Sequence, residues 1–483
     1  MTIRAEQSRA RVRWIALIVL CAGQLMIVID QNIVTVALPT LQHSLGFSEA
    51  SLVWVVNAYA IPFGGLLLLS GRLGDVVGHR AIFLLGIALF GVASFLCGFA
   101  TTKAMLIVFR FIQGVGGAAA SACILGMVAT MFTARRQRAK AIGVYSFASA
   151  GGGAVGPLLG GVLTGLVSWN WIFWINVPIG ATVIILALRV VPKGTERGSI
   201  RRADFLGALL VTTGIMLTVF TISDGGNIGW GSAQTLALAL VCALLLTGFL
   251  VREANTRDPL LPLSMFRSRT LSAANLVQFL VIASMFGLLY FGTLYLQQVL
   301  GFNPLQAGLA FVPIAIVIAA VSLGLSSRFI GRVGQRPTLI IGLALISIAF
   351  ILLCFTRPDG AYLVEFLLAS LAIGLGFGLA APAISGLGMA SVDPSRSGVA
   401  SGLLNTTQQM GGAVGLAVLS AVVTARTASL EVAGNSHAES LDGAYHAAFF
   451  IAAALVVCAL VVALGLPRNT TTAHVADRST AWL

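Results

Sequence analysis

The segment LQHSLGFSEASLVWV (residues 41–55) recurs as LQQVLGFNPLQAGLAFV (residues 296–312), and both contain LQ followed by LGF. A second pair agrees with the first, because GRLGDVVGHR (71–80) matches SRFIGRVGQR (327–336) at nearly the same offset. The chain therefore contains an internal repeat. This repeat predicts two related halves, an organisation typical of carriers that work by alternating access.

The composition identifies the environment of the chain. Of its 483 residues, 58% are hydrophobic and 9% are charged, and the mean hydropathy is +0.97. An ordinary soluble domain contains about 25% charged residues. Apolar stretches of about 20 residues recur along the chain, which is the length of a membrane-spanning helix. They lack the alternation of barrel strands. We therefore expect an all-α polytopic membrane protein.

Fourteen apolar stretches are long enough to predict spanning helices. The predicted spans are 14–38, 52–70, 81–100, 104–131, 139–167, 171–191, 204–223, 233–252, 272–296, 306–326, 337–355, 362–390, 399–425 and 446–466. Together with the repeat, they predict two pseudosymmetric six-helix bundles plus two inserted helices. The predicted domains are an N-terminal bundle (1–191), a linker pair with its loops (192–271), a C-terminal bundle (272–466) and a cytoplasmic tail (467–483).

Basic residues alternate by loop and do not form one patch, although the net charge is +13. If the N-terminus is cytoplasmic, four basic loops fall on its side of the membrane: RRQRAK (135–140), PKGTERGSIRR (192–202), RSR (267–269) and RFIGRVGQR (328–336). This pattern follows the positive-inside rule and argues against nucleic acid as a partner. An even number of spans returns the C-terminus to the cytoplasm as well.

The sequence contains no pattern that predicts catalysis or a cofactor. GVGGAA (114–119) lies inside an apolar run with no preceding strand, so it is not a dinucleotide-binding fingerprint. No P-loop and no metal-binding cluster of His, Cys and carboxylate residues is visible, and the six cysteines occur singly in apolar runs. We expect no enzyme, no metal and no cofactor, and an ion gradient as the energy source.

Several motifs resemble those of a known family. GRLGDVVGHR resembles the cytoplasmic loop motif of the major facilitator superfamily, and LIVFRFIQGVGGAAAS (106–121) resembles its fourth-helix motif. GGGAVGPLLGG (151–161) resembles the Gly-Pro motif that its antiporters carry in the fifth helix. With IDQNIVTVALP (29–39) and WNWIFWINVPIG (169–180), the chain is most similar to the fourteen-helix drug/proton antiporter branch. The resemblance implies a major-facilitator-type fold.

The loop motif is a candidate gate between conformations. Gly71 and Gly78 permit close backbone approach and unusual dihedral angles. Arg72, Asp75 and Arg80 can exchange partners between conformations. The alternative is a tight turn that only obeys the positive-inside rule. The gating role is favoured because Asp75 is an acid in an otherwise basic turn.

The fifth predicted span carries two neighbouring stripes of small residues and proline. Gly152, Gly156 and Gly160 recur every four residues, and Pro157 and Gly161 lie beside them. Such stripes let helices approach closely, and proline weakens the local hydrogen-bond ladder. The spacing predicts a packing groove. The family resemblance further implies that this groove restricts leak and marks exporters.

Polar side chains within the spans are few. They can either join helices by hydrogen bonds or line a substrate cavity, where aromatic side chains could hold flat apolar ligands. The candidate cavity residues are Gln24, Gln31, Asn57, Gln113, Phe147, Asn275, Gln278, Phe286, Tyr290, Phe311, Asn405, Gln408 and Gln409.

Asp30 is a carboxylate in the middle of the first predicted span, where a charge costs roughly 3 kcal/mol on insertion scales. Counting residues inward at the helical rise places Asp30 about 12 Å and Arg110 about 10 Å below the outer ends of their helices. A movement that changes their separation could load and release a proton. Asp30 could instead form a purely structural ion pair or attract a cationic substrate. The family resemblance favours a proton role for both residues.

We therefore expect an antiporter of the cytoplasmic membrane with both termini in the cytoplasm. It would export hydrophobic, cationic or neutral drug-like molecules in exchange for protons. The alternative is an exporter dedicated to one endogenous metabolite or antibiotic. The expected partners are a small molecule, protons and the lipid bilayer, with no nucleic acid and no obligate protein partner.

Overall fold

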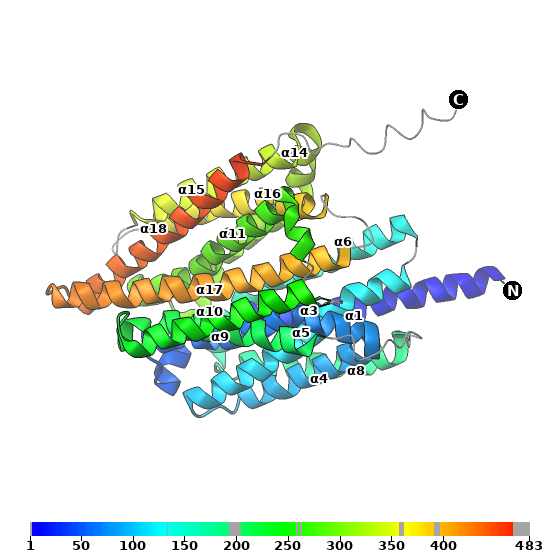
Figure 1. The fold of residues 1–483 in the computed structure, drawn as a ribbon, viewed down its shortest axis with the longest axis horizontal. Helices are drawn as coiled ribbons and strands as arrows, with labels where there is room; N and C mark the ends of the chain where they lie inside the picture. Colours follow the sequence, from blue (N-terminus) through cyan, green and yellow to red (C-terminus); the bar gives the residue numbers. More distant parts are fainter. Residues whose placement is uncertain are drawn as a thin grey trace.

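The structure is a computed structural model that describes residues 2–132, 134–192, 204–256, 259–260, 263–356, 362–390 and 397–466. These residues form a bundle of long helices with no strand among them (Figure 1). The prediction of an all-α fold is confirmed. The predicted tail at 467–483 lies outside the described residues, as does most of the basic loop at 192–202.

The helices follow the order first half, inserted pair, second half. The first half comprises α1 (Thr2–Leu45), α2 (Glu49–Leu52), α3 (Trp54–Val77), α4 (His79–Cys97), α5 (Lys103–Met131), α6 (Arg135–Leu166), α7 (Trp171–Trp174) and α8 (Asn176–Val190). The inserted pair comprises α9 (Phe205–Ile228) and α10 (Ala233–Asn255). The second half comprises η2 (Leu263–Arg267), α11 (Arg269–Leu294), η3 (Tyr295–Val299), α12 (Pro304–Ala310), α13 (Val312–Ala320), η4 (Val321–Leu325), α14 (Ser326–Val333), α15 (Gln335–Leu353), η5 (Leu363–Leu367), α16 (Leu368–Ala390), α17 (Ser397–Val432) and α18 (His437–Leu464).

Within the described residues, 12 helices are long and apolar enough to cross a membrane. A count of 13 results if Trp54–Leu67 and Leu69–Val77, the two parts of α3, form one span across a bend of 51°. The fifth predicted span lies on α6, where only the shorter stretch Gly151–Leu166 is sufficiently apolar. The multi-pass architecture is confirmed, whereas the count of fourteen stays a prediction.

The two halves repeat the same close helix crossing. In the first half, a Cβ atom on Gly86 of α4 would lie 2.7 Å from the carbonyl oxygen of Gly116 on α5. In the second half, a Cβ atom on Gly342 of α15 would lie 2.6 Å from the carbonyl oxygen of Gly376 on α16. A side chain at these positions would collide with the neighbouring backbone, so glycine sets the approach of both helix pairs.

The starts of α4 and α15 are fixed in matching ways. Arg80 Nη2 donates a hydrogen bond to the carbonyl oxygen of Leu188 near the end of α8, at 2.6 Å. Arg336 Nη2 donates to the carbonyl oxygen of Leu464 at the end of α18, also at 2.6 Å. The internal repeat of the sequence therefore corresponds to a repeat of helix contacts.

The inserted pair lies along the seam between the halves (Figure 1). Helix α9 packs against α3 of the first half and α17 of the second, in a cluster that contains Ile61, Val219 and Ala417. Helix α10 packs on α9 and leaves Leu240 and Leu244 exposed. Exposed leucines on a spanning helix form a surface suited to lipid.

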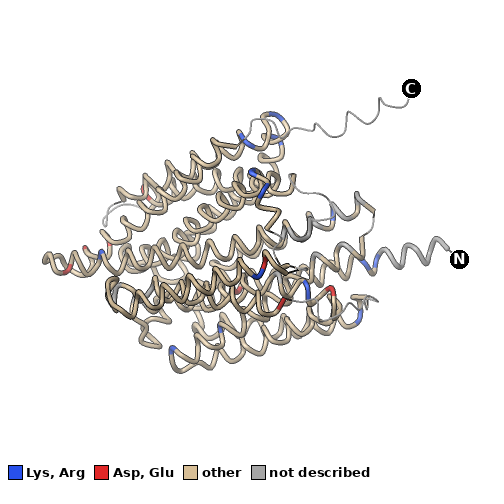
Figure 2. Tube along the Cα trace, viewed as in Figure 1, with Lys and Arg blue, Asp and Glu red and all other residues tan. Residues whose placement is uncertain are grey.

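The two halves touch at the end of the bundle where α1 and α6 finish and α12 begins. A Cβ atom on Gly308 of α12 would lie 2.5 Å from the carbonyl oxygen of Pro157, and one on Gly161 of α6 would lie 2.6 Å from that of Pro304. We call this the closed end. Figure 2 shows Lys and Arg gathered toward the opposite end of the bundle, where α1 begins.

Candidate functional site

The candidate site is built around Asp30 of α1, whose side chain is fully buried. Its Oδ2 accepts a hydrogen bond from Nη1 of Arg110, also fully buried, at 2.6 Å. Its Oδ1 accepts a hydrogen bond from Nε2 of Gln113 at 2.8 Å. Because Arg110 and Gln113 are three residues apart on α5, one face of that helix supplies both donors.

Arg110 also contacts groups other than Asp30. Its Nε donates to the carbonyl oxygen of Val55 at 3.1 Å, and its Nη1 donates to Oε1 of Gln113 at 2.8 Å. Its Cζ lies 4.5 Å from the centroid of the Tyr59 ring, an arrangement that favours a cation. The guanidinium therefore reaches acceptors on α1, α3 and α5 at once, which the point charge of a lysine could not do.

Asn176 at the start of α8 completes the site. Its Nδ2 donates to Oδ1 of Asp30 at 2.7 Å and lies 3.0 Å from Oγ of Ser94. The Ser94 hydroxyl donates in turn to the carbonyl oxygen of Phe173 at 2.8 Å. Both Asn176 and Ser94 are buried. The charged donor and the amide donors together offset part of the cost of burying the carboxylate.

Sequence reasoning did not assign a role to Asn176. The signal was present, because an amide inside the apolar stretch WNWIFWINVPIG is costly unless it finds a partner. Gln113 is a candidate cavity residue, and the structure places it in the hydrogen-bond network of Asp30. The depth argument placed Asp30 and Arg110 at a similar level, and they are in contact.

Helix α1 is positioned by the glycine motif of α6. Gly152, Gly156 and Gly160 form the face of α6 that packs on α1. A Cβ atom on Gly156 would lie 2.7 Å from the Cβ of Asn32, and one on Gly160 would lie 2.5 Å from the carbonyl oxygen of Ile33. The other stripe of the motif meets α12 at the closed end. The motif therefore joins the helix that carries Asp30 to the opposite half.

Two amide contacts cross between the halves beside α1. Gln31 Nε2 donates to Oε1 of Gln409 on α17 at 2.8 Å. Gln297 Nε2 of η3 donates to the carbonyl oxygen of Val36 at 2.9 Å. Gln31 directly follows Asp30, so the contact between the halves and the buried carboxylate share one helical turn.

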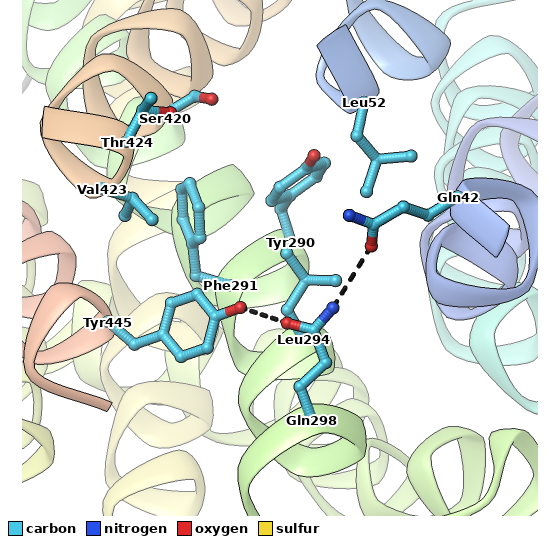
Figure 3. A pocket seen from close by; sticks show the side chains of 10 residues that line it. All are labelled: Gln42, Leu52, Tyr290, Phe291, Leu294, Gln298, Ser420, Val423, Thr424 and Tyr445. Carbon is cyan, nitrogen blue, oxygen red and sulfur yellow. Dashed lines mark hydrogen bonds between the residues drawn. The ribbon is translucent and has the colours of Figure 1, made fainter. Parts of the chain in front are cut away.

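A small pocket lies at the closed end between the halves (Figure 3). Across it, Gln298 Nε2 donates to Oε1 of Gln42 at 3.3 Å, and the Tyr445 hydroxyl donates to Oε1 of Gln298. This chain of side chains joins α1, η3 and α18. The pocket is lined by Gln42, Leu52, Tyr290, Phe291, Leu294, Gln298, Ser420, Val423, Thr424 and Tyr445.

Three of the other candidate cavity amides lie inside single halves. Gln24 is buried and accepts a hydrogen bond from the Ser121 hydroxyl at 2.8 Å. Asn275 is buried and accepts from the Thr407 hydroxyl at 2.9 Å. Asn57 is fully buried, and its amide atoms have no hydrogen-bond partner among the described residues. The first two amides join helices, whereas Asn57 is an unsatisfied polar group.

The remaining candidate cavity residues differ in burial. Tyr290 lines the pocket at the closed end, and Phe311 is buried with its ring centroid 6.1 Å from that of Phe366. Gly412 packs on the ring of half-buried Phe286. Gln278 and Gln408 are half-buried and Asn405 is exposed, while the side chain of Phe147 lies outside the described residues.

The loop motif joins α3 to α4 at the end opposite the closed end. Gly78 connects the two helices with a φ of 108°, which only glycine adopts readily. Asp75 pairs with His79 at 3.4 Å, and Arg72 Nη2 donates to the carbonyl oxygen of Pro259 at 3.3 Å. Gly71 has open space beside it. The acid of the motif is thus paired locally in this structure.

Curated relatives match most of the chain. It is 38% identical over 454 residues to the puromycin resistance protein pur8 of Streptomyces alboniger, covering 93% of this chain and 90% of that protein. It is 39% identical over 426 residues to the cephamycin export protein CmcT of Amycolatopsis lactamdurans, covering 87% of each. It is 33% identical to the multidrug resistance protein Stp of Mycobacterium tuberculosis (strain CDC 1551 / Oshkosh), covering 86% of this chain and 76% of that protein.

Solved structures agree on the fold. A mutant form of the nucleoside transporter NupG superposes with a TM-score of 0.66 at 14% identity, covering 93% of this chain and 99% of that chain. The human organic anion transporter MFSD10 (TETRAN) superposes with a TM-score of 0.64 at 18% identity, with coverage of 93% and 99%. A model of the Major Facilitator Superfamily matches residues 20–416. The chain belongs to the Major Facilitator Superfamily of transporters.

Proposed function

We propose that the protein is a proton-coupled antiporter that exports hydrophobic, cationic or neutral drug-like compounds across the cytoplasmic membrane. Relatives named for antibiotic resistance or export support drug export. Basic residues gathered at the end where α1 begins support a cytoplasmic location for that end. The closed end then faces outward. The seam between the halves provides the substrate path, as in carriers built from repeated halves.

The buried contact between Asp30 and Arg110 is the observation that carries proton coupling. The guanidinium and the two amides that surround the carboxylate favour its ionised form. A movement of α1 relative to α5 would remove these donors and leave a buried charge, so proton uptake by Asp30 would then be favoured. Arg110 keeps its charge throughout. One proton at Asp30 therefore belongs to the state in which this contact is broken.

The contact between Gln31 and Gln409 links this proton step to the movement of the halves. Opening the closed end separates α1 from α17 and breaks this 2.8 Å hydrogen bond. Because Gln31 directly follows Asp30, the same displacement shifts the carboxylate relative to Arg110. Asp75, Arg72 and Arg80 of the loop motif act as the gate at the opposite end by exchanging partners.

The second candidate function is export of one endogenous metabolite or antibiotic. Two relatives are each named for a single antibiotic, puromycin or cephamycin, while a third is named for multidrug resistance. These names support both an exporter of a single compound and an exporter of many compounds. The two candidates share one mechanism and differ in the number of compounds that the seam accepts.

Substrate-induced proton release from energised inverted vesicles tests the proposal. The vesicles are acidified inside, and a chemically broad panel of cationic, neutral and anionic compounds is added in turn. We expect several hydrophobic cationic or neutral compounds to release protons, and vesicles without the protein to show no release. A response to a single compound supports the dedicated exporter. Absence of any response across the panel contradicts proton-coupled export.

A further inference from the structure

The second half contains a titratable pair that the proposed mechanism does not use. Asp442 and His446 lie one turn apart on α18, and Nε2 of His446 lies 3.8 Å from Oδ1 of Asp442. The side chains are 12% exposed for Asp442 and 23% exposed for His446. This separation exceeds hydrogen-bond distance, so the two groups are close without being bonded.

His446 is held in place by Thr356, which follows the end of α15. Its Nε2 lies 3.0 Å from Oγ1 of Thr356. The Thr356 side chain lies between this ring nitrogen and the carbonyl oxygen of Leu353, which is 3.1 Å from Oγ1. Either tautomer of the imidazole can make this contact, because a hydroxyl both donates and accepts hydrogen bonds, and an imidazolium would donate from both ring nitrogens.

Asp442 is left with an unsatisfied oxygen in this arrangement. Its Oδ1 is buried and accepts no hydrogen bond from the described residues. A buried carboxylate oxygen without a donor is costly. A proton on either group relieves this cost, because imidazolium would pair with the carboxylate and a protonated carboxyl carries no charge.

The pair adjoins the side chains that join the halves at the closed end. Tyr445 lies directly before His446 on α18, and its hydroxyl donates to Gln298. Gln298 donates to Gln42 of the first half at 3.3 Å. Figure 3 shows these side chains meeting in the pocket between the halves. A change in charge at Asp442 and His446 therefore acts one residue away from a contact that opening must break.

We propose that Asp442 and His446 form a proton-binding site of the second half that stabilises the closed end when occupied. When the closed end opens, water reaches Asp442 and removes the cost of its unpaired oxygen. The closed state therefore binds the proton more tightly than the open state. By linkage, acidification shifts the protein toward closure. This site regulates the alternation between states, so the inference rests on the proposed function.

Other ionisable groups at this end belong to the elements that surround α18. They are Tyr290 of α11, Tyr295 of η3, Cys354 after α15, Glu365 of η5, and Arg426 and Glu431 of α17. Among the described residues, neither Asp442 nor His446 has another ion-pair partner within 4.0 Å. Arg357 and Asp359 follow Thr356 in the sequence and lie outside the described residues.

Spin-label distances across the closed end test this proposal. Labels are attached at Ser44→Cys on α1 and Ala428→Cys on α17, both exposed, after replacement of the six native cysteines. We expect the short-distance population to rise about fivefold when the pH falls from about 8 to about 5, the range in which histidine titrates. The response should be lost in both His446→Gln and Asp442→Asn.

Two further variants make the result specific. His437→Gln is the matched control, because His437 is an exposed histidine of α18 that pairs with Glu431 at 2.6 Å, and it should keep the full response. Asp30→Asn removes the proton site that belongs to the open state, so in this variant the closure response should be at least as large as in the parent protein. The decisive comparison is therefore made in the Asp30→Asn background, where the outcome does not depend on proton coupling at Asp30. The proposal is overturned if Asp30→Asn shows no rise in the short-distance population on acidification, or if either His446→Gln or Asp442→Asn retains that rise in the same background.

Discussion

At the scale of single residues, Asp30 combines complete burial with hydrogen bonds from three side chains. The donors come from Arg110, Gln113 and Asn176 at 2.6, 2.8 and 2.7 Å. Each donor lies on a helix other than α1. A displacement of α1 therefore removes several donors at once, which is the property required of a carboxylate that changes its protonation during a conformational cycle.

Replacing Arg110 with lysine should abolish coupled transport without preventing folding. Lysine keeps the charge but leaves the Val55 carbonyl oxygen or the Gln113 side chain without its donor, at about 1–3 kcal/mol for each unsatisfied group. Drug-dependent proton flux in liposomes measures the loss. Arg252→Lys is the control, because Arg252 pairs with Asp204 at 2.7 Å in the inserted pair. Equal flux from Arg110→Lys and the parent protein would contradict the guanidinium role.

Replacing Asn57 with leucine should stabilise this state by about 1–2 kcal/mol, because it removes a buried amide whose atoms are unsatisfied. A protein held in one state turns over more slowly, so transport should fall as the thermal unfolding midpoint in detergent rises. Asn275→Leu is the control and should lower the midpoint, since Asn275 is hydrogen-bonded to Thr407. A lower thermal unfolding midpoint for Asn57→Leu than for the parent protein would show that the Asn57 amide is not an unsatisfied group in this state.

The sequence could predict that Asp30 and Arg110 lie at similar depth, because helical rise converts residue number into depth. Their contact depends on how α1 and α5 pack. The sequence could not predict Asn176 as a partner of Asp30, because the rotation of α8 about its axis depends on packing with α1 and α4. Nor could it separate Gln113, which bonds Asp30, from Gln31, which crosses to the other half. A polar residue within a predicted span indicates that its side chain needs a hydrogen-bond partner, but the sequence does not identify that partner.

At the scale of elements, α6 connects α1, the helix that carries Asp30, to the second half. One stripe of its glycines packs on α1, and the other packs on α12. The repeat of glycines could predict that α6 carries a packing groove. The sequence could not predict that the two stripes pack against two different helices. The spacing of the glycines fixes the angle between the stripes around the helix axis, but it does not identify the helices that pack on them.

Replacing Gly161 with alanine should weaken the closed end. The added Cβ would lie 2.6 Å from the Pro304 carbonyl oxygen, so backbone must shift, which costs about 1–3 kcal/mol. We expect labels at Ser44 and Ala428 to show a larger long-distance population. Gly153→Ala on the same helix is the matched control, because no other helix among the described residues comes within 4 Å of its added Cβ. Matching distance distributions for the two variants would refute the close contact.

At the scale of the whole molecule, the internal repeat predicted the two halves, and matching crossings at Gly86 and Gly342 agree with it. The number of spans was harder to predict, because α6 is apolar along only part of its length. The position of the inserted pair against α3 and α17 depends on tertiary packing that hydropathy does not encode. The repeat is therefore matched by helix contacts, whereas the count of fourteen spans stays a prediction.

Drug transport by purified Asp30→Asn protein in liposomes is the most direct test of proton coupling at Asp30. The parent protein and the variant are reconstituted in parallel, a pH gradient is imposed, and uptake of a drug identified in the vesicle panel is measured with proton flux. We predict that the variant folds and binds a neutral substrate, but that the gradient no longer drives its transport. If Asp30→Asn still exchanges drug for protons at the parent rate, Asp30 is not the proton site.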